Sequence, residues 1–285
     1  MVNESPLSSA DHSRDSVGLS YVYPVISRRS AGVSIGINLN SNNACNWRCI
    51  YCQVPNLTLG SAPCVDLVLL EQELRSFLHE LLHGDFMRRR VPESMRRIND
   101  IALSGNGEPT SAEEFAEVVD LVARQMQEKD FPTGIKLVLI TNGSFIFREN
   151  VQQGLRQMAL NNGEIWFKFD RASEAGMRFV NDSHTKIGKV RENLALAISL
   201  CPTWLQTCWM GWDGAAPDKS EENDYLDFLD GLLKTGIKPL GVLLYTLARP
   251  SLQPESSRLT ALKMPEMEAF ATRIRGLGLE VKISL

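Results

Sequence analysis

Short apolar runs alternate with longer amphipathic stretches along most of this 285-residue chain. The apolar runs are rich in Val, Ile and Leu at successive positions, which is typical of strands that are covered on both faces. They predict six strands, at residues 32–39, 99–104, 135–141, 164–170, 203–210 and 239–247. Stretches with an apolar stripe at helical spacing predict helices at residues 65–82 and 111–127, after 142–144, and around 264–278.

Strand and helix alternate through short links that contain Gly or Asn, the pattern of repeated βαβ units and a parallel sheet. We therefore predict an α/β fold, a partial (β/α)6 TIM-like barrel in a single domain over residues 21–285. An open sheet with two layers is the alternative arrangement. Residues 1–20 are rich in Ser and Asp and predict a flexible N-terminal leader. In either arrangement, functional residues are expected just beyond the carboxyl ends of the strands.

Composition excludes several classes of protein. Thirty basic and 34 acidic side chains give a formal charge of −4, so nothing draws the whole molecule toward nucleic acid. The polar N-terminus does not resemble a secretory signal, and no apolar run reaches the roughly 18 residues that a membrane span needs. We therefore expect a cytoplasmic protein without a membrane partner. Six cysteines in such a chain indicate metal or redox chemistry rather than a disulfide framework.

Three of these cysteines, Cys45, Cys49 and Cys52, lie within the stretch CNWRCIYC, directly after the first predicted strand. A structural zinc site normally uses four Cys or His ligands, and Cys64 would have to be the fourth. No second Cys pair or His pair accompanies Cys64, which argues against zinc. A [4Fe–4S] cluster is held by Cys thiolates, and three of them leave one of its four irons open to a substrate or cofactor.

The C-x3-C-x2-C spacing, with the aromatic Tyr51 before the third cysteine, resembles the cluster loop of the radical S-adenosylmethionine (radical SAM) enzymes. SGNGEPT, at residues 104–110, resembles the glycine-rich GGEP-type segment of that family. The longer string at 27–53 is similar to the subgroup that contains the wyosine-type tRNA-modifying synthases (tRNA 4-demethylwyosine synthase-like proteins). The resemblance extends over residues 23–285 and is loose in the later part, where 139–144, 166–170 and 243–250 are similar to segments of that subgroup.

This resemblance implies that the three cysteines bind a single [4Fe–4S] cluster and that the open iron is chelated by the amino and carboxylate groups of S-adenosylmethionine (SAM). A flavodoxin- or ferredoxin-type donor would supply one electron, and cleavage of SAM would give a 5′-deoxyadenosyl radical that abstracts hydrogen from the substrate. The resemblance also implies that Tyr51 packs near the adenine and Trp47 covers the cluster. It implies as well that backbone groups of Gly105, Asn106, Gly107 and Glu108 meet the SAM amino group.

Polar residues follow the later strands. Asn142 and Ser144 either cap the next helix or hydrogen-bond the methionine carboxylate or the ribose. Lys168 and Asp170 are two residues apart, so we expect them on one face of the fourth strand, pointing into the barrel lumen, because an unpaired buried charge is costly. Lys168 would pair with the SAM carboxylate, contact substrate or form a structural ion pair, and Asp170 would bind the ribose. The catalytic candidates are therefore Lys168, Asp170 and, on the fifth strand, Gln206.

Other motifs are interpreted as structural. HELLH (79–83) matches a zinc-protease pattern, but both histidines fall on the polar side of the predicted helix. The arginine-rich run at 88–97 fits a solvated loop better than an RNA contact, and His184 fits a surface loop as well as the active site. Cys64, Cys201 and Cys208 are expected to be small buried side chains rather than a second metal site.

The sequence therefore predicts a radical SAM enzyme with an unidentified small-molecule or peptide substrate. A tRNA base-modifying enzyme of the wyosine-synthase type is the first alternative, and a non-catalytic zinc-binding module is the second. The resemblance does not name a substrate, because one fold serves many reactions.

Overall fold

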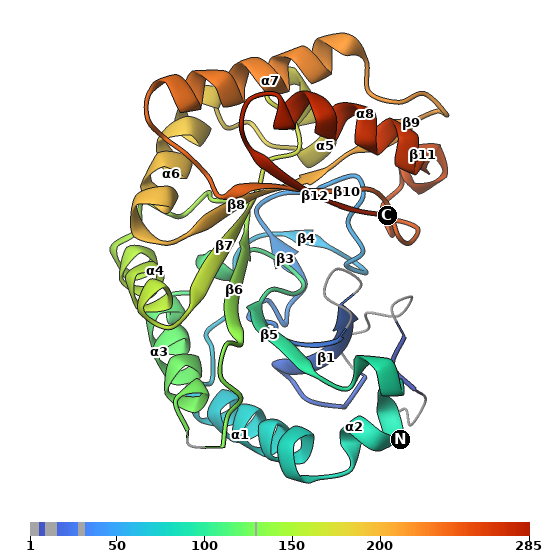
Figure 1. Ribbon diagram of the computed structural model, residues 1–285. Helices are drawn as coiled ribbons and strands as arrows, with labels where there is room; N and C mark the ends of the chain where they lie inside the picture. The colour runs from blue at the N-terminus through green and yellow to red at the C-terminus, as the bar shows by residue number, and fades with distance from the viewer. Residues whose placement is uncertain (1–5, 9–15, 28–31, 129) are drawn as a thin grey trace.

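A curved, mostly parallel sheet forms the centre of the computed structural model, which describes residues 6–8, 16–27, 32–128 and 130–285. Its strand order is β1-β2-β5-β6-β7-β8-β10-β12, and all neighbouring strands are parallel except β1 and β2. The bounds are β1 (Val22–Ser27), β2 (Gly32–Ile37), β5 (Ile98–Leu103), β6 (Lys136–Thr141), β7 (Gly163–Lys168), β8 (Thr203–Cys208), β10 (Gly241–Tyr245) and β12 (Glu280–Ser284). Figure 1 shows that this sheet curls into a half-barrel, which confirms the predicted partial barrel and single domain.

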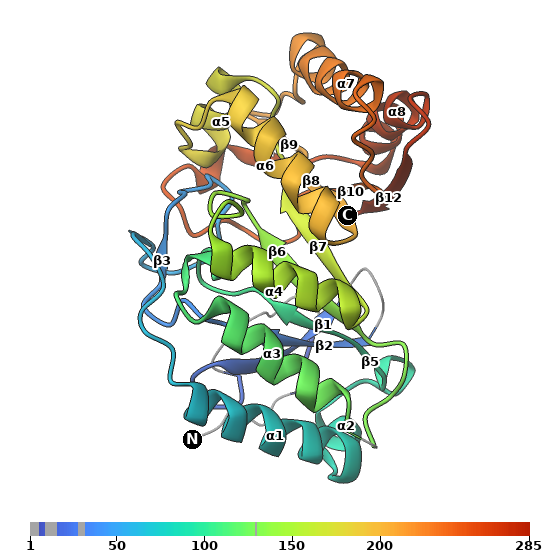
Figure 2. The ribbon, with the colours of Figure 1, turned by 90° about the vertical axis from the view of Figure 1, so that its left-hand side faces the viewer.

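Helices connect the parallel strands and lie along the outside of the curl (Figures 1 and 2). The longer ones are α1 (Leu67–His83), α3 (Phe115–Met126), α4 (Glu149–Leu160), α6 (Ile187–Leu200), α7 (Lys219–Lys234) and α8 (Met264–Arg275). Shorter helices are α2 (Phe86–Arg90), α5 (Glu174–Asn181), η1 (Glu93–Met95), η2 (Pro109–Ser111) and η3 (Ser256–Arg258). Two small ribbons complete the fold, β3 (Ala44–Cys45) with β4 (Thr58–Leu59), and β9 (Met210–Trp212) with β11 (Leu259–Ala261).

The apolar stripes predicted for the helices face the sheet. Leu70, Leu74, Phe77 and Leu81 of α1 are buried, whereas His79 and His83 are exposed, so the interpretation of HELLH as part of a polar face is confirmed. Asp66 caps α1, because its side chain accepts a hydrogen bond from the backbone N–H of Leu69. None of the helices formed by the described residues is long and apolar enough to span a bilayer.

The two edges of the sheet differ from the sequence prediction. The antiparallel strand β1 was not predicted, and Pro24 in its middle is tolerated because β1 is an edge strand. At the other edge, β12 adds a seventh parallel strand after the last helix. The expected leader at 1–20 lies largely outside the described residues, but the backbone N–H of Leu7 donates to the carbonyl of Arg90 at 2.7 Å and its side chain is buried.

Several predicted elements are shorter than expected, and the difference lies at the ends that approach the site. Strand β2 ends at Ile37 rather than at residue 39, and β10 covers 241–245 rather than 239–247. The helix expected at 111–127 begins at Phe115, because Pro109–Ser111 first form the 3-10 turn η2. These two strands thus end before the predicted positions, and residues that follow their carboxyl ends line a cavity.

Candidate functional site

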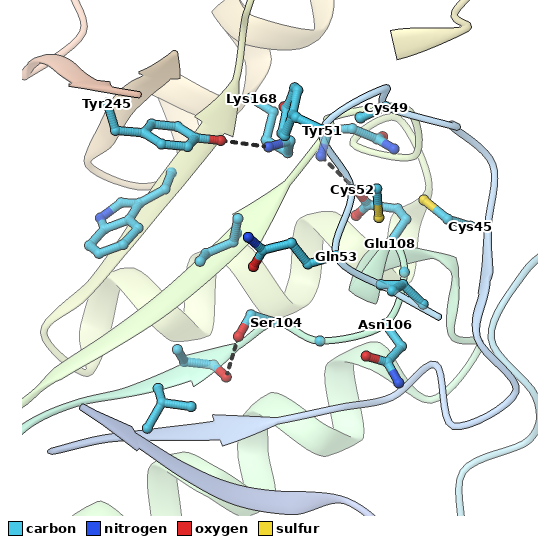
Figure 3. A pocket seen from close by; sticks show the side chains of 18 of the residues that line it. Cys45, Cys49, Tyr51, Cys52, Gln53, Ser104, Asn106, Glu108, Lys168 and Tyr245 are labelled. Carbon is cyan, nitrogen blue, oxygen red and sulfur yellow. Dashed lines mark hydrogen bonds between the residues drawn. The ribbon is translucent and has the colours of Figure 1, made fainter. Parts of the chain in front are cut away.

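A cavity of about 350 Å³ lies inside the half-barrel, where the carboxyl ends of the strands meet (Figure 3). Its lining includes Cys45, Cys49 and Cys52, the five residues from Ser104 to Glu108, and Asn142, which follows β6. The two motifs that lie more than fifty residues apart in the sequence therefore face one space. This is the location expected from the parallel topology.

The cysteine loop, residues 38–60, is held against the SGNGEPT segment mainly by asparagine side chains. Asn38 Oδ1 accepts from the backbone N–H groups of Asn106 at 2.9 Å and of Asn40 at 3.2 Å. Asn40 Nδ2 in turn donates to the carbonyl oxygen of Ala44 at 2.9 Å. These short polar side chains satisfy backbone groups that no strand or helix pairs, so an irregular loop has a defined shape.

Two glycines allow this close approach. Gly105 has a φ of +150°, and a Cβ atom added to it would lie 2.3 Å from Asn38 Oδ1. A Cβ on Gly107 would lie 2.1 Å from the carbonyl oxygen of Ala44. Both positions therefore require glycine so that the segment can contact the cysteine loop, in addition to any contact with a ligand.

The other side of the loop rests on segments from the second half of the chain. The backbone N–H groups of Arg48 and Ile50 donate to the carbonyls of Asn181 at 3.1 Å and Val180 at 2.9 Å, at the end of α5. The Arg48 guanidinium forms a double hydrogen bond with Glu255, at 3.0 and 2.9 Å. The loop is thus fixed from two directions, with Cys45, Cys49 and Cys52 lining the cavity.

Glu108 joins the ends of β5 and β6. Its buried carboxylate accepts from the backbone N–H and the hydroxyl of Thr110, from the hydroxyl of Thr141 at 2.6 Å and from the backbone N–H of Asn142 at 2.6 Å. Burial raises the pKa of Glu108, and these four hydrogen bonds oppose that rise. The family resemblance implies a backbone role toward SAM for Glu108, and in the structure its side chain also fixes the cavity wall.

Asn106 presents an unused acceptor at the cavity. Its Nδ2 donates to Asn43 Oδ1 at 2.6 Å, and Asn43 Nδ2 donates to the carbonyl oxygen of Pro55 at 3.1 Å. Because a carbonyl only accepts, this chain of contacts fixes the orientation of both amides. Asn106 Oδ1 is then left buried without a hydrogen-bond partner in the described structure. A buried acceptor of this kind is costly unless a ligand supplies the donor.

Lys168, at the end of β7, supplies a positive charge to the cavity. Its Nζ atom lies 3.3 Å from the hydroxyl of Tyr245 and 5.0 Å from the centre of the Tyr51 ring. Burial is the largest single influence and lowers the pKa of Lys168, but the surrounding acidic groups, Tyr245 and Asp170 foremost, together raise it, so the net direction is upward. A buried ammonium at the wall of a cavity can pair with the carboxylate of a ligand.

Asp170, Gln206 and Ser144 lie outside the residues that line the cavity. Asp170 lies beyond the end of β7, so it does not share a strand face with Lys168 as expected, and its carboxylate accepts from Tyr51, Asn181 and the backbone of Cys208. Gln206 is buried in β8, in register with Lys168 of β7. Ser144 donates its backbone N–H to Asn142 Oδ1 at 2.9 Å, so Asn142 caps this turn while it also lines the cavity.

Several residues that line the cavity were not predicted from the sequence. They include Gln53, directly after Cys52, and, from other segments, Tyr23, Ser34, Asp100, Trp166 and Arg249. The alternation Asp100, Ala102, Ser104 on β5 is a signal that could have identified one side of this lining, since every second residue of a strand faces the same way. Residues of β1 could not be assigned, because that strand was not predicted.

The three thiols of the cysteine loop are a donor set of the kind that holds an iron–sulfur cluster. Among the described residues, no three His, Cys, Asp or Glu side chains converge in a way that would hold one ion. Cluster ligands need not converge, since each cysteine binds a different iron. Burial raises the pKa of Cys45 to about 12 and of Cys49 to about 11, so both are thiols until a bound metal favours the thiolate. Trp47 also lines the cavity and is 7% exposed.

The remaining cysteines do not join this group. Cys64 is exposed, and its Sγ lies 3.1 Å from Glu114 Oε1. It therefore differs from the predicted small buried side chain. Cys201 and Cys208 are buried, as predicted.

No family model matches the chain. Among curated proteins, a UPF0026 protein of Helicobacter pylori is 25% identical over 177 residues, which is 60% of this chain and 49% of the relative. A UPF0026 protein of Methanocaldococcus jannaschii is 29% identical over 161 residues, which is 56% of this chain and 43% of the relative. The chain thus spans about half the length of the curated relatives it matches.

Solved structures show the same architecture. The structure of TYW1 with a bound lysine–pyruvate adduct aligns with a TM-score of 0.59 and 12% identity, over 85% of this chain and 73% of that one. A radical SAM methyltransferase from Sphaerobacter thermophilus aligns with a TM-score of 0.57 and 11% identity, over 92% of this chain and 68% of that one. The chain therefore has the fold of the radical SAM enzymes, as the resemblance of its cysteine loop and SGNGEPT segment predicts.

Proposed function

We propose that the chain is a radical SAM enzyme. Cys45, Cys49 and Cys52 would hold a [4Fe–4S] cluster, and SAM would lie across the strand ends between the cysteine loop and the SGNGEPT segment. When bound, the cluster supplies one electron for the reductive cleavage of SAM, whose product abstracts hydrogen from the substrate. The observation that carries this proposal is that both motifs line one cavity at the carboxyl ends of a parallel half-barrel.

The side chains around the cavity fit the functional groups of SAM. Asn106 Oδ1 is positioned to accept from the amino group, because its own amide nitrogen is already engaged with Asn43. The Lys168 ammonium would bind a carboxylate, either that of the methionine portion of SAM or that of the substrate. Trp47 and Tyr51 add aromatic surface that excludes water from the reacting atoms.

A small molecule or peptide is the substrate that fits best. The cavity continues past the cysteines between β1, β5 and β7, enclosed by side chains of the barrel lumen. The arginine-rich run at 88–97 precedes β5, so it lies toward the amino ends of the strands, opposite the cysteine loop. Arg89 pairs with Asp85 at 2.6 Å and Arg90 is buried, so neither is placed to grip RNA phosphates near the cavity.

Anaerobic reconstitution with iron and sulfide tests the proposal. The wild-type protein should gain about four iron and four sulfide per chain and the broad absorbance of a cluster, and should form 5′-deoxyadenosine from SAM and dithionite. A variant with Cys45, Cys49 and Cys52 all replaced by Ala should lose both properties. Cys201→Ala, a matched change at a buried cysteine outside the cavity, should keep them.

The same measurements can also overturn the proposal. A wild-type protein that binds zinc without iron or sulfide would contradict it, as would a triple variant that retains the cluster. Cluster binding without formation of 5′-deoxyadenosine would leave the metal site but remove the proposed reaction.

A further inference from the structure

Asn181, the last residue of α5, contacts a sulfur of the cysteine loop that lies 132 positions earlier in the chain. Its side-chain nitrogen Nδ2 lies 3.3 Å from Cys49 Sγ and 2.7 Å from Asp170 Oδ2. A carboxylate oxygen only accepts hydrogen bonds, so the atom facing it must be the amide nitrogen rather than the amide oxygen. The two hydrogens of this nitrogen therefore serve the two acceptors, one each.

The carboxylate that orients Asn181 is itself fixed. Asp170 is 1% exposed, and its Oδ2 also accepts from the Tyr51 hydroxyl at 2.5 Å. Its other oxygen, Oδ1, accepts from the backbone N–H of Cys208 at 2.7 Å. With both oxygens engaged, Asp170 holds the amide of Asn181 in one orientation, and the second N–H is directed at Cys49.

The backbone of Asn181 holds the same loop. Its carbonyl oxygen accepts from the backbone N–H of Arg48 at 3.1 Å, one residue before Cys49. Asn181 is buried at 1% exposure, so its side chain is shielded from water that would compete for the sulfur. The amide is thus positioned relative to Cys49 by the loop and by Asp170 together.

We propose that Asn181 is a positioning residue that tunes the reduction potential of the cluster through its hydrogen bond to Cys49. The inference rests on the proposed function, since it requires Cys49 to ligate a cluster. An N–H group directed at a ligand sulfur stabilises negative charge there, and the reduced cluster carries one more negative charge than the oxidised cluster. The contact therefore favours the reduced form and raises the potential.

A comparison with Cys45 shows why this contact can be tested separately. Cys45 Sγ lies 3.5 Å from the backbone nitrogen of Trp47, a contact that comes with the loop conformation and survives any side-chain change. The contact to Cys49 comes from a side chain of another element. Replacing Asn181 by an apolar residue removes that donor and keeps the backbone carbonyl that holds Arg48.

The test is an EPR-monitored redox titration of the anaerobically reconstituted protein without SAM. Asn181→Leu, which is close in size and lacks a donor, should give a cluster with a more negative midpoint potential than wild type. Asn193→Leu is the matched control, because Asn193 is also buried but donates to the backbone carbonyl of Gly143 rather than to sulfur. Its potential should equal that of wild type.

Asn181→Ser is a second variant with a smaller change in volume. A hydroxyl has one hydrogen, and the charged carboxylate of Asp170 is a stronger acceptor than a ligand sulfur, so Cys49 should again lose its donor. The potential should again shift to more negative values, while iron and sulfide content stay at the wild-type level.

The outcomes separate the inference from the proposed function. If wild-type protein shows no cluster signal, the proposed function fails. If wild type has a cluster and both Asn181 variants titrate at the wild-type potential, the tuning role is wrong. If both variants fold but do not take up iron, while Asn193→Leu does, then Asn181 serves cluster assembly and the tuning role is again rejected.

Discussion

The cysteine loop is held mainly by hydrogen bonds, whereas an aromatic cluster between the sheet and the helices α7 and α8 is held by packing of its rings. The loop is fixed by directional hydrogen bonds to distant segments: Asn38 accepts one from the backbone N–H of Asn106, and Arg48 donates to Glu255. The aromatic cluster contains Phe169, Trp209, Tyr225, Phe228 and Phe270, and is fixed by ring packing, with centroid separations of 4.2 Å for Trp209–Phe270 and 4.4 Å for Phe169–Phe228.

The two regions differ because the cysteine loop borders a cavity that must stay open to a ligand, whereas no residue of the aromatic cluster lines that cavity. Apolar side chains stabilise a region by filling space, and a filled space cannot admit a ligand. Hydrogen bonds hold backbone in place across a gap, so the cysteines can stand at the edge of a cavity. Changes in the aromatic cluster should therefore affect stability, and changes around the loop should affect ligand binding.

The largest expected effect on stability is that of Phe270→Ala. Phe270 is 1% exposed and contacts both Trp209 and Tyr225. Its truncation should lower the free energy of unfolding by about 3–5 kcal/mol, because it leaves a cavity in a packed region. Urea unfolding followed by circular dichroism measures this loss. The folded fraction should bind iron as wild type does, and a variant of normal stability that lacked iron would contradict the division between the two regions.

Asn106→Ala should weaken ligand binding and have little effect on the free energy of unfolding. It removes the buried, unpaired Oδ1 of a residue that lines the cavity, together with the contact to Asn43, so we expect the affinity for SAM to fall about tenfold, which corresponds to one hydrogen bond of about 1.4 kcal/mol. Equilibrium binding of SAM to the reconstituted protein measures this change. Asn150→Ala is the matched control, since Asn150 is half-buried and donates to the carbonyl of Glu113 outside the cavity. Equal affinities for the two variants would remove Asn106 from the binding site.

The smallest effect is expected for Glu255→Gln, which weakens the pair with Arg48. The hydrogen bond from Arg48 lowers the pKa of Glu255 below its ordinary value of 4.5. The pair therefore stabilises the folded state above pH 4.5, and this contribution is lost as the pH falls through the lower folded-state pKa. Both side chains are partly exposed, so the loss in the variant at pH 7 should stay below about 1 kcal/mol.

Thermal unfolding at several pH values measures this contribution. The melting temperature of Glu255→Gln should lie slightly below that of wild type at pH 7, and the difference should shrink toward zero in acid. A difference that grew on acidification would show that the pair does not stabilise the loop.

The sequence by itself determined six of the parallel strands and the helices α1, α3, α4 and α8, because the apolar runs of buried strands and the stripes of amphipathic helices are local patterns. It also predicted which thiols lie at the cavity, since the spacing of Cys45, Cys49 and Cys52 and the SGNGEPT segment are local as well. It did not identify β1, whose Pro24 disguises an edge strand.

Only the tertiary structure decided which polar residues face the cavity. Asp170 follows the sequence pattern of a ligand contact, yet its carboxylate is engaged by Tyr51, Asn181 and Cys208. Asn181 carries no local signal, and it gained its place beside Cys49 because α5 docks against the cysteine loop. The physical reason is that a hydrogen bond depends on a few ångströms and a direction between groups far apart in sequence, which no local pattern of residues records.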